Sequence, residues 1–580
     1  MGVRAVTTIT MSLFSELRRR NVFKVAVVYL VGAPLLFWLA LIAEAQLGLP
    51  DWFNYIALAL LILAFPGVLM FAWVYEITPS GLRKAIEVDQ TQSIVFKTGQ
   101  KLNAALAVLT VLAAVAMIAD RLLPELARPD LTPLDEIRRD LIVDPDAASR
   151  LVTPSGERTP TEIRSFTLEN GLEVIVWPDH DIPNVAMYLF VRAGSRNEVP
   201  GITGLSHFFE HMMFNGSENV PSGEFDKIMS AAGGANNAYT SPDLTVYQDW
   251  FPSSALHTVF ALEADRFGNL AIDPEAVESE RGVVYSERRT RIDNDSFGSL
   301  YEKLVATAWV AHTYQLPVIG WPSDIEAWTQ DDLENYFRTY YAPNNMVMVI
   351  AGDIEAEHAY NLVRTYFGDI PSQPAPAEVR TVEPPQQGQR RLTVSLPGQA
   401  PLLHFGFHSV KATDPDALAI ELLTNILVNG NSSRLHRALV EEASLALSVG
   451  SFAYGEIDPG LFYLYLTLPV GADVAAVEAR VMEVLADVVD NGVTEEELAK
   501  ARNIMLADYW RRVSMIDGKA ALVGEAAVLQ GNYETLFDLP DQVDALTVDA
   551  LKQAAARVFR AENSTVGVFL PAVASDGGDQ

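Results

Sequence analysis

The chain has 580 residues, a length that suggests two to four domains. Of its 42 basic and 74 acidic side chains, 10 and 7 fall in residues 1–123, which leaves 32 basic against 67 acidic ones in the remainder. So acidic a body repels phosphate backbones, which argues against nucleic acid as a partner. Cysteine is absent, which excludes disulfides, thiolate ligands and a cysteine nucleophile. Any metal must therefore be held by histidine and carboxylate groups.

Three windows without a charged residue lie near the start of the chain, at 25–43, 52–75 and 102–119. Each is close to the roughly 20 apolar residues that cross about 30 Å of hydrocarbon. Buried helices of a soluble core are the alternative, but three such runs with polar ends favour transmembrane helices. We expect residues 1–123 to form a membrane anchor.

Basic residues predict the orientation of this anchor. Arg18, Arg19, Arg20 and Lys24 precede the first predicted span and four more basic residues lie between the second and third, whereas the first loop has none. The positive-inside rule places these segments in the cytoplasm and everything after the third span on the far side. The first span lacks a small-residue cleavage site, so we interpret it as a retained anchor. Met11 is an alternative start to Met1.

The segments ELRRRNVFKVAVVYLV, LGLPDW and FPGVLMFAWVYEITPSGLRK resemble a three-helix module found at the front of otherwise unrelated bacterial membrane proteins. This resemblance implies a multi-pass anchor in a bacterial inner membrane. The rest of the chain would then lie on the periplasmic side. The module implies no chemistry of its own.

Two proline-rich stretches, 124–160 and 371–390, predict linkers. They delimit an N-terminal half at 161–370, a C-terminal half at 391–571 and a tail at 572–580. The halves echo one another at an offset of 218 residues. The echoing positions are Thr329, Asp331, Leu333, Tyr341 and Asn345, which match Thr547, Asp549, Leu551, Phe559 and Asn563. We interpret this echo as a duplication.

Both halves mix strand and helix patterns. Alternating apolar runs predict strands at 172–178, 185–193, 246–251, 391–396, 402–408 and 461–468, and helical periodicity marks 224–233, 256–270, 474–490 and 495–513. We expect an α+β fold of two homologous α/β halves with mostly antiparallel sheets, preceded by three transmembrane helices.

The sequence HFFEH at 207–211 carries the candidate chemistry. A helix that starts at Thr203 or Ser206 and stops at Gly216 would place His207 and His211 on one face, with Glu210 beside them. Two neutral imidazoles can bind Zn²⁺ while a free glutamate takes a proton from the attacking water. Packed histidines on an aromatic helix face are the alternative, but the rarity of the pattern favours a metal.

Two further features bear on the metal site. His404 and His408 share the spacing but lie on a predicted strand without a carboxylate, so we expect them to be structural. A catalytic zinc needs a third protein ligand. The predicted helix PEAVESERGVVYSERR carries Glu280 and Glu287 two turns apart on one face. Buried carboxylates are costly unless paired or bound to metal, and the spacing leaves both choices open.

The reversed zincin motif, with a glutamate 76 positions beyond His211, resembles the pitrilysin/insulinase family of inverzincin metallopeptidases. GLEVIVW, GGANNAYTS, ERGVVYSE and NSSRLHRALVEE extend the similarity over about residues 160–571. The resemblance implies His207, His211 and Glu287 as ligands of one zinc ion per chain. It implies Glu210 as the general base and Glu280 as an acidic partner of the ligands.

The same resemblance makes Asn237, Ala238 and Tyr239 part of an edge strand onto which an extended peptide adds, with broad specificity. One departure concerns the C-terminal half, where the family usually carries an Arg and a Tyr that reach the substrate. Those positions are Val440 and Leu447 here. A second pitrilysin-like chain, in a homodimer or heterodimer, could complete the site.

We therefore expect a membrane-anchored zinc endopeptidase that hydrolyses short or unfolded peptides. The alternative is a non-catalytic peptide-binding or scaffolding subunit of a heteromeric peptidase, which the missing Arg and Tyr would suit. The complete set of ligands and base favours the enzyme.

Overall fold

The computed structural model describes residues 162–572 except Tyr454, together with β1 (Tyr75–Thr78), β2 (Gly81–Lys84) and a few single residues before them. β1 and β2 pair as an antiparallel hairpin in which Tyr75 lies opposite Lys84. The backbone divides into two units, residues 1–133 and 134–580, and each is described by itself.

Apart from a few single residues, the three predicted spans lie outside the described residues, as do the linker at 124–160 and nearly all of the tail. Tyr29 and Leu61, in the first two spans, are helical, and the Tyr29 hydroxyl donates to the Leu61 carbonyl at 2.5 Å. Across the described part of the chain, no helix has the length and apolar character to cross a membrane. Tyr75, the last residue of the second charge-free window, has extended backbone and pairs in β1.

A six-stranded mixed sheet forms the centre of the N-terminal half, in the order β3-β4-β8-β5-β7-β6. Its strands are β3 (Arg164–Thr167), β4 (Glu173–Pro178), β5 (Asn184–Val191), β6 (Ala235–Thr240), β7 (Thr245–Pro252) and β8 (Met346–Gly352). The pair β4–β8 is parallel and the others are antiparallel. The apolar runs predicted as strands form β4, β5 and β7, and β5 and β8 are buried because both faces of the sheet are covered.

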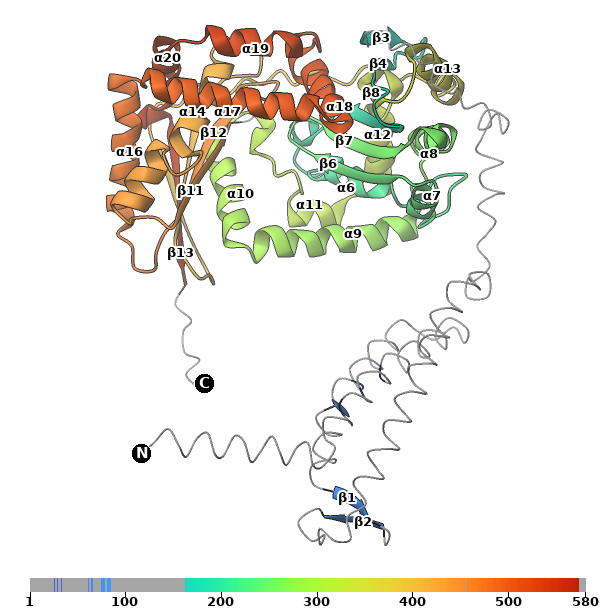
Figure 1. The fold of residues 1–580 in the computed structure, drawn as a ribbon, viewed down its shortest axis with the longest axis horizontal. Coiled ribbons are helices and arrows are strands. Elements are labelled where there is room, and N and C mark those ends of the chain that lie inside the picture. Colours follow the sequence, from blue (N-terminus) through green and yellow to red (C-terminus); the bar gives the residue numbers. More distant parts are fainter. Residues whose placement is uncertain are drawn as a thin grey trace. The chain divides into compact units, whose positions relative to one another are not determined.

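Helices surround this sheet (Figure 1). Along the N-terminal half of the chain, the helices are α6 (Leu205–Met212), α7 (Phe225–Ala231), α8 (Leu256–Gly268), α9 (Pro274–Arg288), α10 (Ser296–Ala308), α11 (Pro322–Ala327), α12 (Gln330–Tyr340) and α13 (Ala356–Phe367). The core on one face of the sheet joins Phe208 and Phe209 of α6 to Val259 of α8 and Leu333 of α12. The sheet and this core hold the HFFEH helix in place.

The C-terminal half contains a five-stranded mixed sheet in the order β11-β12-β10-β13-β9, in which only β13–β9 is a parallel pair. Its strands are β9 (Arg390–Leu396), β10 (Leu402–His408), β11 (Ser448–Ala453), β12 (Leu461–Thr467) and β13 (Ser564–Pro571). Its helices are α14 (Ala417–Val428), α15 (Arg434–His436), α16 (Val474–Asn491), α17 (Glu495–Val513), α18 (Ile516–Glu525), α19 (Thr535–Ala545) and α20 (Val548–Val558). The predicted helices at 474–490 and 495–513 match α16 and α17.

The sequence echo corresponds to equivalent structure in the two halves. Thr329 caps α12 and Thr547 caps α20, each through its side chain. Asn345 donates to the carbonyl of the residue five positions earlier at 2.9 Å, and Asn563 does the same at 2.9 Å. Both helices lead into a strand, β8 or β13, that lies inside its sheet. The equivalence supports the duplication.

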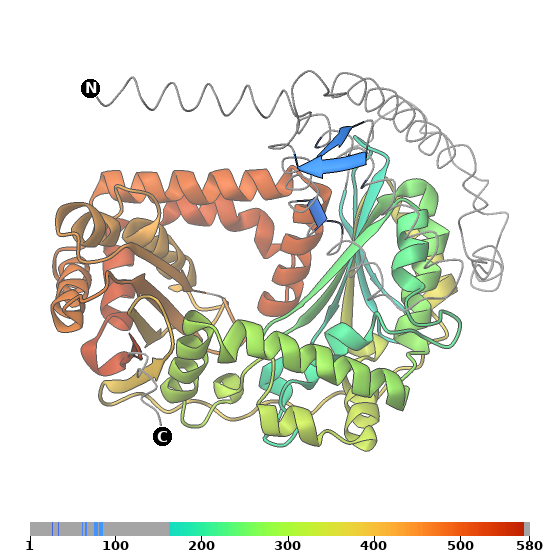
Figure 2. The same ribbon diagram turned by 90° about the horizontal axis from the view of Figure 1, so that it is seen from below.

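The two halves exchange a helix. α10 belongs to the N-terminal half in sequence but packs on the C-terminal sheet, where Leu300 contacts Val394, Leu402 and Phe569. In return, α18 packs on the N-terminal sheet, and a Cβ at Gly524 would lie 2.0 Å from the Phe190 ring. Figure 2 shows both crossings, on opposite sides of the body. The exchange locks the halves together.

His404 and His408 are structural, as predicted. His404 on β10 is completely buried, its Nδ1 lies 2.6 Å from the Tyr463 hydroxyl, and burial lowers its pKa to about 3. The Nε2 of His408 lies 2.8 Å from the carbonyl of Ala308. Neither ring belongs to a potential metal-binding cluster among the described residues.

Candidate active site

The helix α6 presents the HFFEH residues, but its start differs from the prediction. Gly204, in a left-handed conformation with φ 90°, is the N-cap, and the helix ends at Met212. Thr203 does not cap it because its hydroxyl donates to Asp324 at 2.7 Å. The buried carboxylate of Glu198 instead accepts the backbone N–H groups of Gly204 and Ser206, both at 2.7 Å. The helix is therefore capped from outside itself, which the sequence search for a local cap missed.

Helix α9 brings the carboxylate of Glu287, the predicted third ligand, to the two histidines. Its N-cap is Asp273, and Val277 and Val284 anchor one side of it in the core. The Oε2 atom of Glu287 lies 3.5 Å from the Nε2 of His207 and 3.3 Å from the Nε2 of His211. Among the described residues these three side chains form the one cluster with potential metal-ligand atoms, all within 4.8 Å of one another.

These separations fit a tetrahedral zinc site. Ligand atoms about 2.0–2.1 Å from zinc lie about 3.3–3.4 Å from one another, close to the two distances found here. The Oε2 of Glu287 is buried between the imidazoles without a hydrogen-bond partner. Such an unsatisfied buried oxygen is expected where the atom coordinates a cation. The Oε1 of the same carboxylate lies 3.1 Å from Arg291.

Glu280 orients His211. Its Oε1 accepts a hydrogen bond from the Nδ1 of His211 at 2.7 Å, and its Oε2 accepts one from Asn215 at 2.7 Å. With the proton held on Nδ1, the Nε2 of His211 has its lone pair free for a metal. The structure thus distinguishes the two glutamates that the spacing alone left open: Glu287 faces the ligand cluster and Glu280 supports it.

The protonation of the histidines also suits a metal. Burial lowers the pKa of His207 to about 4, and the neighbouring His211 lowers it further. Burial also lowers the pKa of His211, but the hydrogen bond to Glu280 and the nearby carboxylate of Glu287 outweigh it and raise the value to about 9. The cluster therefore attracts a positive charge, which a cation can provide in place of a proton.

Glu210 is held by a residue that the sequence reasoning missed. The hydroxyl of Thr240, the last residue of β6, donates to the Oε2 of Glu210 at 2.6 Å. Burial raises the pKa of Glu210, whereas this hydrogen bond lowers it. The strand period offered a signal, because Thr240 lies two residues beyond Ala238 on the same face of the strand.

Asn237, Ala238 and Tyr239 lie on β6, as the resemblance implied. β6 is the last strand of the sheet, and its described pairing is with β7 alone, with Asn237 opposite Gln248. Asn237 is exposed, and Tyr239 packs against the core shared with α18. The outer edge of β6 can therefore accept an additional strand, and it leads to Glu210 at its Thr240 end.

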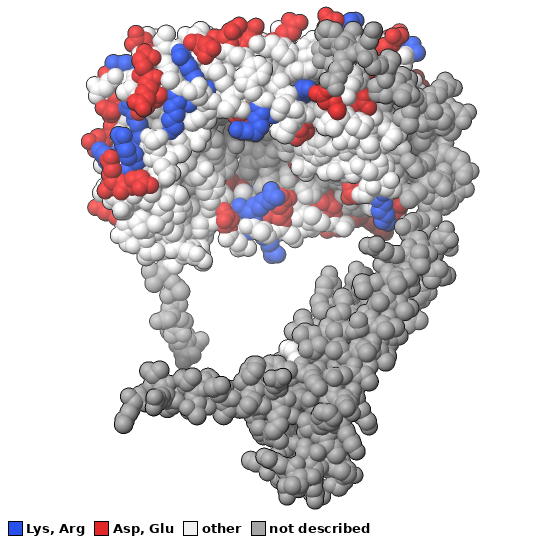
Figure 3. Space-filling view, in the orientation of Figure 1, with Lys and Arg blue, Asp and Glu red and all other residues white. Residues whose placement is uncertain are grey.

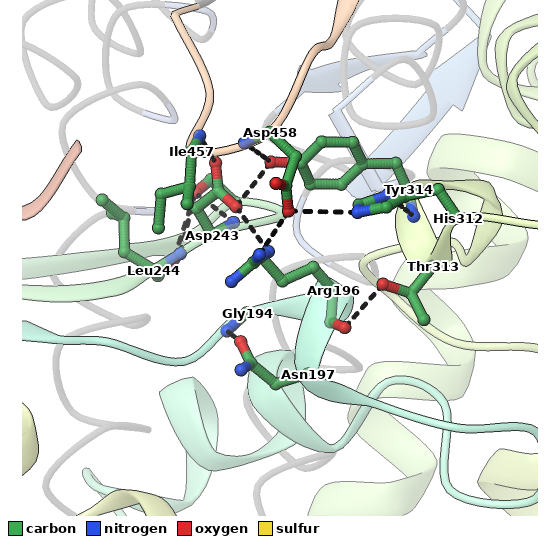
Figure 4. A network of polar contacts seen from close by, with 11 residues as sticks. Gly194, Arg196, Asn197, Asp243, Leu244, His312, Thr313, Tyr314, Ile457 and Asp458 are labelled. Atoms are coloured by element: carbon green, nitrogen blue, oxygen red, sulfur yellow. Dashed lines mark hydrogen bonds and ion pairs between the residues drawn. The ribbon is translucent and has the colours of Figure 1, made fainter. Parts of the chain in front are cut away.

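A polar network fixes the turn between β6 and β7 to the C-terminal half (Figure 4). Asp243 in this turn accepts from the Tyr314 hydroxyl at 2.8 Å and lies 3.3 Å from Arg196. Arg196 also pairs with Asp458, which lies 3.1 Å from His312. Asp458 comes from the loop between β11 and β12, so the network joins both halves.

Backbone groups complete this network. The N–H of Ile457 donates to Asp243 at 3.0 Å, and the N–H of Asp458 donates to the Tyr314 hydroxyl at 3.1 Å. The side chains of Asp243 and Arg196 are 3% and 12% exposed. Because both charges are largely out of water, removing either partner leaves the other uncompensated.

Val440 and Leu447 supply no polar group. Val440 packs against the core of the C-terminal half, and Leu447, just before β11, is 61% exposed. The surface between α9 and α17 is hollowed, with acidic and basic side chains at its margins (Figure 3).

Family models and relatives agree with this arrangement. Residues 174–321 match the model described as insulinase, peptidase family M16, and residues 327–505 match the model described as peptidase M16 inactive domain. The first match contains the HFFEH helix and Glu287. The second begins in α11 and covers most of the C-terminal half.

The chain is 30% identical over 410 residues to the zinc protease PqqE of Helicobacter pylori, which covers 70% of this chain and 92% of that one. It is 26% identical over 401 residues to the uncharacterized zinc protease YmxG of Bacillus subtilis, with 68% and 96% covered. The crystal structure of a protease from Helicobacter pylori superimposes with a TM-score of 0.69 at 29% identity over 71% of this chain and 100% of that one. The chain belongs to the insulinase family of peptidases, peptidase family M16.

Proposed function

We propose that the chain is a zinc-dependent endopeptidase that cleaves short or unfolded peptides. The observation that carries the proposal is the convergence of the Nε2 atoms of His207 and His211 on the Oε2 of Glu287, at 3.5 and 3.3 Å. Glu210 on the same helix is held by Thr240 and is left out of this cluster. Its relatives named zinc proteases are consistent with this assignment.

His207, His211 and Glu287 would hold the zinc ion. When bound, the ion would supply Lewis-acid activation of a water molecule and of the peptide carbonyl. Glu210 takes the proton of the attacking water and returns it to the leaving amine. Glu280 keeps His211 in the tautomer that leaves Nε2 free.

The edge of β6 supports the proposed preference for peptides without stable structure. A peptide that adds to β6 must be extended, and its backbone forms most of the hydrogen bonds. Folded proteins offer few such segments, because their strands are already paired. Broad sequence specificity follows, since the backbone is common to all peptides.

Removal of the metal tests this function. We expect the full chain to bind one zinc ion, to lose cleavage of an unfolded peptide when a chelator removes it, and to recover with one equivalent of zinc. Cleavage by the metal-free chain would contradict the proposal. A chain that binds peptide and zinc without cleavage would favour the alternative, a non-catalytic subunit of a heteromeric peptidase.

We also propose that residues 1–123 anchor the chain in a bacterial inner membrane, with the body on the periplasmic side. The support is the charge-free windows and the asymmetry of basic residues. The absence of cysteine provides a clean test, because Glu496→Cys would place a single thiol on the exposed surface of α17. An impermeant maleimide should label it in intact spheroplasts, and protection until lysis would contradict this orientation.

A dimer is the third part of the proposal. Val440 and Leu447 offer no hydrogen-bond donor, so a second chain of the same family would supply one to the substrate. Sedimentation of the detergent-solubilised chain should give the mass of a dimer. A fully active monomer would exclude this role for a second chain.

A further inference from the structure

A recess of about 560 Å³ lies at the end of β6 farthest from Glu210. Segments that are distant in sequence line it: the loop after β4 at 179–184, the start of β6 at 233–235, the end of β7 at 250–252, and the turn between α17 and α18 at 514–517. Both halves of the chain therefore build it, through the exchanged helix α18.

The recess combines acidic groups with apolar walls. Its lining includes Asp179, Asp181 and Asp517 but no lysine, arginine or histidine. Lys519, just outside the lining, pairs with Asp179, which leaves the recess with a net negative charge. The apolar part of the lining comprises Ile182, Trp250, Phe251, Pro252, Met515 and Ile516.

The position of the recess follows from the register of β6. Thr240 contacts Glu210, and Ala235, five residues earlier, borders the recess. At about 3.3–3.4 Å per residue, the strand spans about 17 Å between them. A peptide paired along the outer edge of β6 would thus run from the level of Glu210 to the level of the recess, which the lining residues place beside the paired edge of β6.

We propose that this recess is a subsite for a lysine or arginine side chain of the peptide, about five residues from the position that pairs beside Thr240. The long aliphatic part of such a side chain would contact Ile182 and Met515, while its charge would lie near Asp517. The proposal rests on the proposed peptidase function. The subsite would add a preference for a positively charged side chain to a binding site that otherwise recognises only the peptide backbone.

The test uses the full chain and matched peptides of about twelve residues with blocked termini. Lysine or its uncharged isostere norleucine is placed at one position, which is moved along an otherwise neutral sequence. Asp517→Asn removes a charge from the recess. Asp549→Asn is the control, because Asp549 lies in the first turn of α20 as Asp517 lies in the first turn of α18, so both variants lose the same helix-terminus interaction.

We expect kcat/KM to favour lysine about fivefold at one position, mainly through KM because the contact is remote from the scissile bond. Asp517→Asn should reduce this preference to less than about twofold and leave the norleucine peptide unchanged, whereas Asp549→Asn should keep it. High salt should weaken the preference. Equal rates for lysine and norleucine at every position, or an unchanged preference in Asp517→Asn, would overturn the subsite.

Binding separates the subsite from the peptidase function. Fluorescence anisotropy of labelled lysine and norleucine peptides on the Glu210→Gln chain reports the subsite without any cleavage. A lysine preference that Asp517→Asn removes, in a chain that never cleaves, would uphold the subsite and refute the peptidase function. Zinc-dependent cleavage without a preference for lysine in either assay would refute the subsite and uphold the peptidase function.

Discussion

The contact between Glu210 and Thr240 controls the protonation of the proposed general base. A general base must be ionised, and burial opposes ionisation by raising the pKa of Glu210. The hydroxyl of Thr240, 2.6 Å from Oε2, counteracts this effect because it donates to the carboxylate. The strand that we propose to bind the peptide would thereby also tune the base.

Thr240→Val should therefore shift the acid limb of the pH profile of kcat/KM to higher pH. The substitution keeps the shape of the side chain but removes the donor, so the pKa of Glu210 rises and more of the base is protonated at a given acidic pH. A hydrogen bond to a charged group contributes about 1.5–3 kcal/mol, so the loss of activity on the acid side should reach about tenfold or more. Thr240→Ser should retain the wild-type profile, and an identical profile for the valine variant would contradict this role.

At the scale of single residues, the sequence predicted the candidate zinc site better than it predicted the residues that hold this site in place. Helix geometry and the family resemblance give a meaning to the spacing of four residues, which are His207, Glu210, His211 and Glu287. Thr240 and Glu198 act through contacts with residues 30 and 8 positions away. The strand period places Thr240 on a face of β6 but does not identify its partner. Only the folded chain brings these partners together.

Among the elements, α6 is short and has no side-chain cap of its own. It has 8 residues, and its N-cap is a glycine without a side-chain acceptor. Glu198, 1% exposed, fills that role from the preceding loop and also accepts the Ser206 hydroxyl at 2.7 Å. The orientation of three site residues therefore depends on one carboxylate outside the helix.

Glu198→Ala should lower the melting temperature and the zinc affinity together. It leaves the N–H groups of Gly204 and Ser206 without an acceptor, at about 1–3 kcal/mol for each buried donor. Glu198→Gln keeps an acceptor and should have a smaller effect. Thermal unfolding with zinc titration measures both, and wild-type zinc affinity in the alanine variant would show that the cap does not position the ligands.

The same carboxylate predicts a pH dependence of stability. Burial raises the pKa of Glu198 from 4.5 to about 7, so the folded state binds this proton more tightly than the unfolded state. Its contribution to the free energy of unfolding is thus complete below pH 4.5 and is lost as the pH rises toward 7. The glutamine variant should lack this component.

In the whole molecule, two devices hold the halves together: the exchange of α10 and α18, and the network around Arg196. The network fixes the turn that follows β6, so it couples the relative position of the halves to the peptide edge. The recess at the other end of β6 also needs both halves. The C-terminal half therefore shapes the peptide site although it provides none of the proposed zinc ligands.

Asp458→Ala should destabilise the body and reduce cleavage. Loss of one partner from a buried ion pair costs about 3–5 kcal/mol, reduced here because Asp458 is 31% exposed. Asp508→Ala, which breaks an exposed pair with Arg511, is the control and should cost at most about 1 kcal/mol. Urea unfolding compares the two, and equal small effects would show that the network does not stabilise the contact between halves.

The sequence predicted two α/β halves because hydrophobic periodicity is a local signal, and it predicted their duplication because the chain can be compared with itself at an offset of 218 residues. It did not predict the helix exchange. The apolar faces of α10 and α18 do not specify which sheet they cover, because that choice depends on the path of the chain in three dimensions. The boundaries at 370 and 391 thus describe the order of the chain and not its packing.

Zinc content and peptide cleavage of the Glu210→Gln chain test the central claim most directly. Because Glu210 is not among the three clustered ligands, the variant should retain one zinc ion per chain, with cleavage reduced by about 10²–10⁴-fold or more. His207→Ala, as the companion variant, should lose the metal. Full cleavage by Glu210→Gln with zinc retained would contradict the account.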